Sequence, residues 1–133
     1  MDYLRNKQWG PREVQMLSPL QLAYVGDAVY EVFVRTQLIE NKKCKVNQLH
    51  RLATKYVKAE AQSEIIHRIE DLLTEEEKTI VRRGRNAKSN SVPKNAKLSD
   101  YKNATALECL VGFLYLEKRD DRLKELLSDM IEL

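Results

Sequence analysis

The chain has 133 residues, 43% of them hydrophobic and 32% charged, a composition typical of one soluble globular domain and not of a disordered chain. No apolar run approaches the roughly 18 residues that a membrane span needs, and the mixed-charge N-terminus contains no secretory signal. Cys44 and Cys109 lack metal-ligand spacing, so both are interpreted as reduced thiols of a cytoplasmic protein with no membrane partner.

Helix signals follow one another along the chain. Ser18 and Gln21 predict a capping box at the start of a long helix, and Thr74 and Glu77 predict a second box further on. Apolar residues recur at helical spacing, and none alternates with the period of a strand over a useful length. The predicted fold class is therefore all-α. We expect helices over 19–39, 46–57, 61–73, 75–84 and 101–118, and a last helix through Ile131 that Asp120 or Asp121 caps.

The net charge of +3 is small, but the basic residues are unevenly placed. Residues 82–102 hold seven Lys or Arg against one acid, Asp100. Within this segment, residues 86–99 include Pro93 and several Asn and Ser, so we expect a basic loop there. Such a loop favours contact with a polyanion, although a solvated cationic loop explains the charge equally well.

Two carboxylates stand alone in apolar helical stretches. Asp27 is the only formally charged residue of 14–30, and Glu108 is the only one of 104–116. A carboxylate among buried apolar side chains must be protonated, paired or bound to a cation, because burying a bare anion costs several kcal/mol. Two such residues on two long helices predict opposite walls of a site for a hard, oxygen-loving metal ion.

Two glycines fall inside the helices that carry these carboxylates. Gly26 immediately precedes Asp27, and Gly112 lies one turn after Glu108. A glycine in a helix interior costs about 1 kcal/mol relative to alanine, so its usual reason is a close helix–helix contact. We therefore expect the two helices to pack closely and to bring the two carboxylates together.

Three motifs resemble the ribonuclease III family. The stretch LQLAYVGDAVY at 20–30 keeps the GDAV core of the family's signature helix, approximately ERLEFLGDAVL. ATALECLVGFLYLE at 104–117 is similar to the family's second motif, ADAFEALIGAIYLD, with Glu108 on its Glu. VRRGRNAKS at 81–89, followed by PKN at 93–95, resembles a narrower group, the Mini-ribonuclease III proteins, which keep the catalytic domain and lack a double-stranded-RNA-binding domain. The resemblance implies the helical bundle of the ribonuclease III endonuclease domain.

The chain departs from the family pattern at several acidic positions. Leu20 and Ala23 stand at the two Glu positions of the signature, and Thr105 replaces the Asp of the second motif. A full site of this family has four carboxylates, of which Asp27 and Glu108 remain. Two protein carboxylates leave more of the coordination to water and phosphate oxygens, which suits Mg²⁺.

The resemblance implies that the chain is a homodimeric, Mg²⁺-dependent endonuclease. Such an enzyme hydrolyses double-stranded RNA and leaves 5′-phosphate and 3′-hydroxyl ends. Carried over to this chain, Asp27 and Glu108 are both the metal ligands and the catalytic residues. The narrower group trims the precursor of the large-subunit ribosomal RNA, so this precursor is the expected substrate and ribosomal proteins on it are further candidate partners. The alternative is a catalytically inactive protein of the same fold that only binds double-stranded RNA.

The resemblance also implies where the partners bind. In family members the signature helices meet across the dimer, so a dimer interface is expected at Tyr24, Val25 and Ala28, which monomer core would explain as well. Without an appended RNA-binding domain, the basic segment must supply more of the affinity for RNA. The expected phosphate contacts are Arg83, Arg85, Lys88, Lys94 and Lys102. Residues 1–133 are expected to form one catalytic domain, with 1–16 as an N-terminal extension.

The other titratable residues in the helices are interpreted as structural. Glu31 lies four residues after Asp27, and we favour an ion pair with Arg35 over a role near the metal. His50 and His67 lie on amphipathic helices with no acidic motif beside them, so neither is assigned to catalysis.

Overall fold

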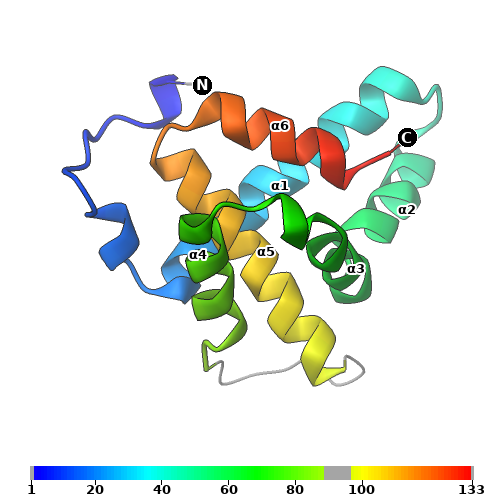
Figure 1. The fold of residues 1–133 in the computed structure, drawn as a ribbon. Coiled ribbons are helices and arrows are strands. Elements are labelled where there is room, and N and C mark those ends of the chain that lie inside the picture. Colours follow the sequence, from blue (N-terminus) through cyan, green and yellow to red (C-terminus); the bar gives the residue numbers. More distant parts are fainter. Residues whose placement is uncertain (1, 89–96, 133) are drawn as a thin grey trace.

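The computed structural model describes residues 2–88 and 97–132, and in these ranges the chain forms helices and no strand. The all-α prediction is thus confirmed, and no helix of the described ranges is long and apolar enough to cross a membrane. The helices, shown in Figure 1, are α1 (Pro19–Asn41), α2 (Val46–Val57), α3 (Ala59–Ile69), α4 (Glu75–Arg85), α5 (Leu98–Leu116) and α6 (Asp120–Met130). Short 3-10 turns lie at η1 (Asp2–Leu4), η2 (Val14–Met16) and η3 (Glu70–Leu72).

Both predicted capping boxes are present. The Ser18 hydroxyl accepts a hydrogen bond from the Gln21 amide at 3.1 Å, and the Gln21 side chain accepts one from the Ser18 amide at 2.9 Å. Thr74 and Glu77 make the same reciprocal pair at the start of α4, at 3.2 and 2.9 Å. Each box satisfies two backbone donors that a helix start leaves without partners, which is why these starts could be located from the sequence.

The expected cap of the last helix is wrong. Arg119 occupies the N-cap position of α6 without a side-chain cap, and Asp120 and Asp121 are the first helical residues. The Asp120 carboxylate instead accepts hydrogen bonds at 2.7 and 2.8 Å from the guanidinium of Arg5, a residue far away in the sequence. A bidentate contact with a buried guanidinium is stronger than a local cap, so the long-range partner prevails.

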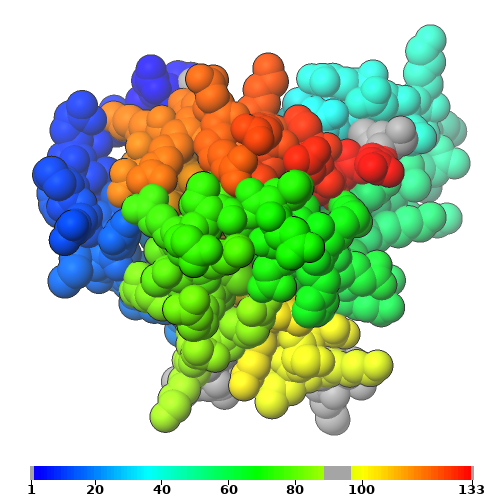
Figure 2. Space-filling model, viewed as in Figure 1, coloured from blue at the N-terminus to red at the C-terminus, as the bar shows by residue number. Residues whose placement is uncertain are grey.

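The N-terminal residues pack onto the end of α5 instead of extending from the body. Arg5 is 7% exposed, and besides Asp120 it donates a hydrogen bond to the backbone carbonyl of Tyr115 at 2.8 Å. Val14 in η2 is fully buried in the same core as α1 and α5. Figure 2 shows this segment, in blue, lying against the start of α6, in orange. These residues therefore belong to the packed body of the protein.

Helix α5 is the central element, because α1, α3, α4 and α6 all contact it. Every residue from Asn103 to Tyr115 is buried except Glu108, which is partly exposed. A helix with apolar residues on every side can only sit inside a bundle. Between Asn103 and Tyr115, the helix is therefore exposed to solvent only at Glu108.

The crossing of α1 over α5 depends on two glycines, as expected. A Cβ atom on Gly26 would overlap the backbone carbonyl of Glu108, and a Cβ on Gly112 would overlap the backbone carbonyl of Leu22. The two helix backbones are thus closer than any side chain allows. This contact fixes the relative positions of Asp27, which follows Gly26, and Glu108.

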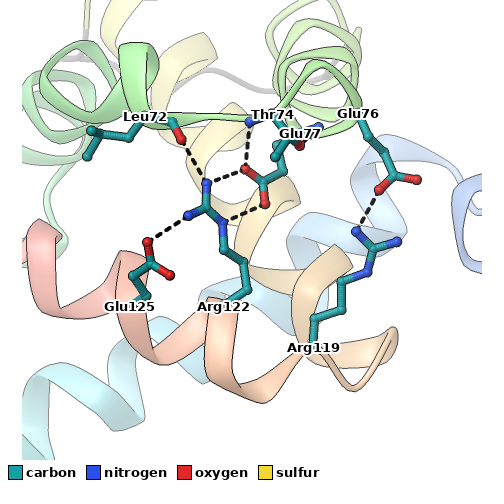
Figure 3. A network of polar contacts seen from close by, with 7 residues as sticks. All are labelled: Leu72, Thr74, Glu76, Glu77, Arg119, Arg122 and Glu125. Carbon is teal, nitrogen blue, oxygen red and sulfur yellow. Dashed lines mark hydrogen bonds and ion pairs between the residues drawn. The ribbon is translucent and has the colours of Figure 1, made fainter.

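A largely buried ion pair joins α6 to α4 (Figure 3). Arg122 donates to both carboxylate oxygens of Glu77, at 2.9 and 2.7 Å, and to the backbone carbonyl of Leu72 at 2.8 Å. Burial works to raise the pKa of Glu77, which is 1% exposed, but the hydrogen bonds from Arg122 and Thr74 outweigh it and hold the pKa below its ordinary value. The pair therefore stabilises the fold at neutral pH, and this contribution is lost in acid as the pH falls through the lowered pKa.

Candidate functional site

The carboxyl groups of Asp27 and Glu108 meet where α1 crosses α5. Their side chains are joined by a hydrogen bond, and both line an open hollow with a volume of about 570 Å³. The rest of its lining is mostly apolar or aromatic and comes from the same two helices: Leu20, Ala23, Tyr24, Val25, Ala28, Glu31, Tyr101 and Thr105. The fold thus brings the two carboxylates together at one site, as predicted.

Glu108 carries a proton at neutral pH in the metal-free protein. Burial, together with the hydrogen bond and the negative charge of Asp27, raises the pKa of Glu108 to about 9, and a hydrogen bond from Gln62 only partly opposes this. Glu108 therefore holds the proton that joins the two carboxyl groups. A divalent cation placed between them would replace that proton and neutralise the repulsion that holds it there.

The two carboxylates differ in exposure. Glu108 is partly buried, as expected from its apolar surroundings, but Asp27 is exposed, so the expectation of an enclosed anion is wrong for Asp27 in a single copy of the chain. The reason is that its apolar neighbours on the same face of α1 are exposed too: Tyr24 is 86% exposed and Val32 is 60% exposed. Helix α1 is apolar both where it meets the core and on its outer face.

The outer face of α1 carries a continuous apolar stripe beside the site. Leu20, Tyr24, Ala28 and Val32 follow one another at four-residue spacing, which places them in one row along the helix. We refer to these four residues as the α1 stripe. Of the expected interface residues, Tyr24 and Ala28 belong to it, whereas Val25 is partly buried and packs against the core.

The chemistry of the donors fits a hydrated Mg²⁺ ion. Asp27 and Glu108 supply carboxylate oxygens, which this ion prefers, and the hollow is open enough for water and phosphate to complete its coordination. Within the described ranges, no group of three or more His, Cys, Asp or Glu side chains is placed to hold a metal. Glu31 lines the same hollow but pairs with Arg35 at 2.8 Å, the contact we favoured. His50 and His67 are not among the lining residues.

Two of the expected phosphate contacts are used inside the molecule. The Arg83 guanidinium donates to the backbone carbonyls of Gln15 at 2.8 Å and Leu17 at 2.9 Å, which attaches the N-terminal segment to α4. The Arg85 guanidinium pairs with Glu70 at 3.0 Å. Several donors of these two arginines thus serve the fold, and phosphate contacts at Arg83 and Arg85 stay a prediction.

The remaining candidates for phosphate contacts in the basic segment are Lys88, Lys94 and Lys102. Lys88 and Lys102 are exposed, while Lys94 lies outside the described residues together with most of the expected loop. Helix α5 begins at Leu98, so the end of that loop, residues 98 and 99, is helical instead.

A second basic surface was missed in the sequence. Residues 42–58 contain six Lys or Arg and no acid. The exposed Lys42, Lys43, Arg51 and Lys55 border one hollow of about 470 Å³ between the end of α1 and α2. We call these four residues the α2 basic surface. A count of Lys and Arg along residues 42–58 would have found this surface. The helical spacing of the apolar residues in the same stretch indicates only how the helix packs. Along α1, the 1.5 Å rise per residue places the end of the helix, where this surface begins, about 20 Å from Asp27.

Comparison with known proteins adds independent information. Residues 20–119 match the family model of the ribonuclease III domain. The chain is 50% identical over 129 residues to Mini-ribonuclease 3 from Thermoanaerobacter sp., a match that covers 96% of this chain and 91% of that protein. It is 45% identical over 132 residues to Mini-ribonuclease 3 from Clostridium tetani, covering 98% and 87%. A crystal structure of a Fusobacterium nucleatum protein has a TM-score of 0.79 at 31% identity, covering 89% of this chain and 94% of that one.

Proposed function

This chain belongs to the ribonuclease III family and is an endoribonuclease, and from this premise we propose that it cleaves double-stranded RNA with Mg²⁺ held by Asp27 and Glu108. The observation that supports the metal site is the hydrogen-bonded carboxyl pair of Asp27 and Glu108, held where two family motifs cross and open to solvent on one side. Perturbed carboxyl groups in a hollow are typical of catalytic sites.

The role of the two carboxylates follows from their positions. Asp27, on the exposed wall, faces the side from which a phosphate would approach, and Glu108 must release its proton before both groups can bind one cation. When bound, Mg²⁺ would supply positive charge against the developing charge of the phosphate and lower the pKa of a water nucleophile. The helices that carry both groups are fixed by the glycine crossing, so this geometry exists before RNA binds.

A protein nucleophile is not available from the thiol beside the site. Burial raises the pKa of Cys109 to about 12, and its Sγ donates to the backbone carbonyl of Pro19. A protonated, buried thiol does not attack phosphorus at neutral pH. Water is therefore the nucleophile in our proposal. It bonds to phosphorus while the bond from phosphorus to the 3′-oxygen breaks, and the proton that water loses balances the proton that the 3′-oxygen gains. The products carry 5′-phosphate and 3′-hydroxyl ends.

We further propose that two copies of the chain join through the α1 stripe. An exposed row of apolar side chains beside a catalytic hollow is the kind of surface that a symmetric interface covers. Burial of this row in a dimer would also reduce the exposure of Asp27 without closing the hollow to phosphate. A two-fold dimer presents one carboxyl pair to each strand of a duplex.

The proposed substrate is the precursor of large-subunit ribosomal RNA in the cytoplasm. This proposal is supported by the motifs shared with the Mini-ribonuclease III group and by the high identity to proteins that carry that name. Duplex RNA offers phosphates and 2′-hydroxyls across a shallow minor groove, so it is recognised mainly by shape and backbone. The α2 basic surface, Lys88 and Lys102 are the proposed backbone contacts, with ribosomal proteins on the precursor as candidate partners.

The proposal is tested by incubating the purified protein with a plain RNA duplex. We expect cleavage with Mg²⁺, none with a chelator, and recovery when excess Mg²⁺ is restored, with product ends identified by ligation and phosphatase treatment. Single-stranded RNA of the same sequence is the control. Binding of the duplex without any Mg²⁺-dependent cleavage would instead favour the inactive RNA-binding alternative, which the loss of two family carboxylates keeps open.

The basic surfaces are tested by the salt dependence of duplex binding. The double variants Lys42→Gln/Lys55→Gln and Lys88→Gln/Lys102→Gln should each reduce the slope of log affinity against log salt by about two units, because each lost phosphate contact removes about one. Arg83→Gln should lower the thermal stability and leave the slope nearly unchanged, since its donors hold backbone carbonyls.

Binding is measured at several salt concentrations with the metal removed, so that cleavage does not interfere. An unchanged slope in both double variants would mean that these lysines are merely solvated. A reduced slope in Arg83→Gln at full thermal stability would return this arginine to the RNA surface.

A further inference from the structure

One buried amide beside the carboxyl pair has an oxygen without a partner. Gln62 on α3 is 2% exposed, and its Nε2 donates a hydrogen bond to the backbone carbonyl of Val57 at 3.0 Å. Its Oε1 accepts no hydrogen bond, and in the described ranges it is the one buried side-chain oxygen in this condition. Buried polar atoms are normally paired, so an exception beside a functional site calls for a specific role.

The orientation of this amide is fixed by its surroundings. The Val57 carbonyl can only accept, so reversing the amide would set two oxygens against each other. The amide of Gln62 also lies close enough to the Glu108 carboxyl to favour the ionised form of that group. The amide nitrogen is thus held by Val57 near Glu108, and the amide oxygen is left without a partner.

The neighbouring buried polar residues lack this feature. Asn103 donates to the Ser63 hydroxyl at 3.0 Å and accepts from Arg85 at 2.7 Å, so the amide of Asn103 is paired at both ends. This network explains the polar residues between α3 and α5 as structural. Gln62 lies one residue before Ser63 on the same helix, yet its oxygen takes no part in the network.

We propose that Gln62 is a positioning residue of the metal site, whose Nε2 orients the Glu108 carboxylate and whose Oε1 accepts a hydrogen bond from the water shell of the bound cation. This inference rests on the proposed metal site and extends it by a third side chain. Mg²⁺ keeps several of its waters when it binds, and those waters are strong donors that need acceptors. With only two protein carboxylates at the site, most of the shell is water, so a fixed neutral acceptor is of direct use.

The test compares two replacements of similar size. Gln62→Met removes both donor and acceptor, and we expect it to weaken Mn²⁺ binding to the RNA-free protein by about 10- to 100-fold, the usual effect of losing such a partner. Gln62→Glu keeps an acceptor oxygen and should bind Mn²⁺ at least as tightly as the unaltered chain. Gln37→Met, the same replacement ten residues from Asp27 on α1, should leave Mn²⁺ binding unchanged.

Binding is measured by the loss of the free Mn²⁺ signal in electron paramagnetic resonance, with thermal unfolding recorded for each variant. Mn²⁺ affinity of Gln62→Met equal to that of the unaltered chain would overturn the inference and leave Gln62 a packing residue. If Gln62→Met does not fold, a tenfold loss of Mn²⁺ affinity in Gln62→Glu would overturn the acceptor role, and retained affinity would support it. Failure of the unaltered chain to bind Mn²⁺ and to cleave RNA would instead refute the proposed function.

Discussion

Replacing Asp27 by Asn, or Glu108 by Gln, should abolish cleavage of duplex RNA while leaving the fold intact. Each replacement removes one of two carboxylates that we propose to hold the cation, and no third acid in the described ranges is placed to compensate. Loss of such electrostatic stabilisation lowers rates by about a thousandfold or more. Single-turnover cleavage of a plain duplex measures the loss, and circular dichroism with thermal unfolding shows whether the fold is kept.

The Glu108→Gln variant should also reveal the proton that Glu108 holds in metal-free buffer. The folded-state pKa of Glu108, about 9, lies above its ordinary value of 4.5, so the folded chain binds more protons between these values. The unaltered protein therefore loses stability as the pH rises through this window. Glu108→Gln cannot ionise, so it should be more stable than the unaltered chain in chelator, by an amount that is small at pH 5 and grows towards pH 9.

A third carboxylate provides the matched control. Glu31 lines the same hollow, but its oxygen is paired with Arg35, so Glu31→Gln should retain cleavage within a few-fold. Near-normal cleavage by Asp27→Asn or Glu108→Gln would show that the catalytic centre lies elsewhere. Equal losses in all three variants would mean that the hollow responds to charge in general and not to two specific ligands.

Replacing Tyr24 by Glu should separate the proposed dimer and remove activity with it. Tyr24 is 86% exposed in one copy, so the change does not disturb the monomer core. In a symmetric interface the new carboxylate would face apolar side chains of the other copy. Because both copies carry the substitution, it would disturb the α1 stripe on both sides of the interface. Analytical ultracentrifugation at micromolar concentration should give a dimer for the unaltered chain and a species of about 15.5 kDa for the variant.

The control for this experiment is an exposed apolar residue away from the α1 stripe. Leu72 in η3 is 52% exposed, and Leu72→Glu should remain dimeric and active. If the unaltered chain sediments as a monomer and still cleaves duplex RNA, two sites in one dimer are not required for activity. If Tyr24→Glu remains a dimer, the interface lies on another surface.

The sequence by itself determined those features that depend on near neighbours. Capping boxes at Ser18 and Thr74 join residues three apart, so the starts of α1 and α4 could be predicted to the residue. The apolar stretch around Glu108 likewise predicted a buried helix, and the interior Gly26 predicted the close crossing beside it. The motifs carried by these helices led to the ribonuclease III family, which the comparisons confirm.

The tertiary structure alone decided which partner each polar side chain takes. Asp120 was expected to cap its own helix, but Arg5, which is 115 residues away, binds it instead. Basic charge predicted Arg83 for RNA, whereas its guanidinium holds backbone carbonyls of a segment 66 and 68 residues earlier. Charge and helical spacing do not reveal such partners, because the contacts form only when distant elements pack.

Exposure of a helix face was also decided only by packing. The apolar residues around Asp27 predicted an enclosed carboxylate, yet that face of α1 is uncovered in one copy of the chain. Periodicity shows which residues share a face of a helix, but not which faces another element covers. The unpaired oxygen of Gln62 could not be predicted from the sequence either, because it depends on how α3 packs that amide against the Val57 carbonyl inside the fold.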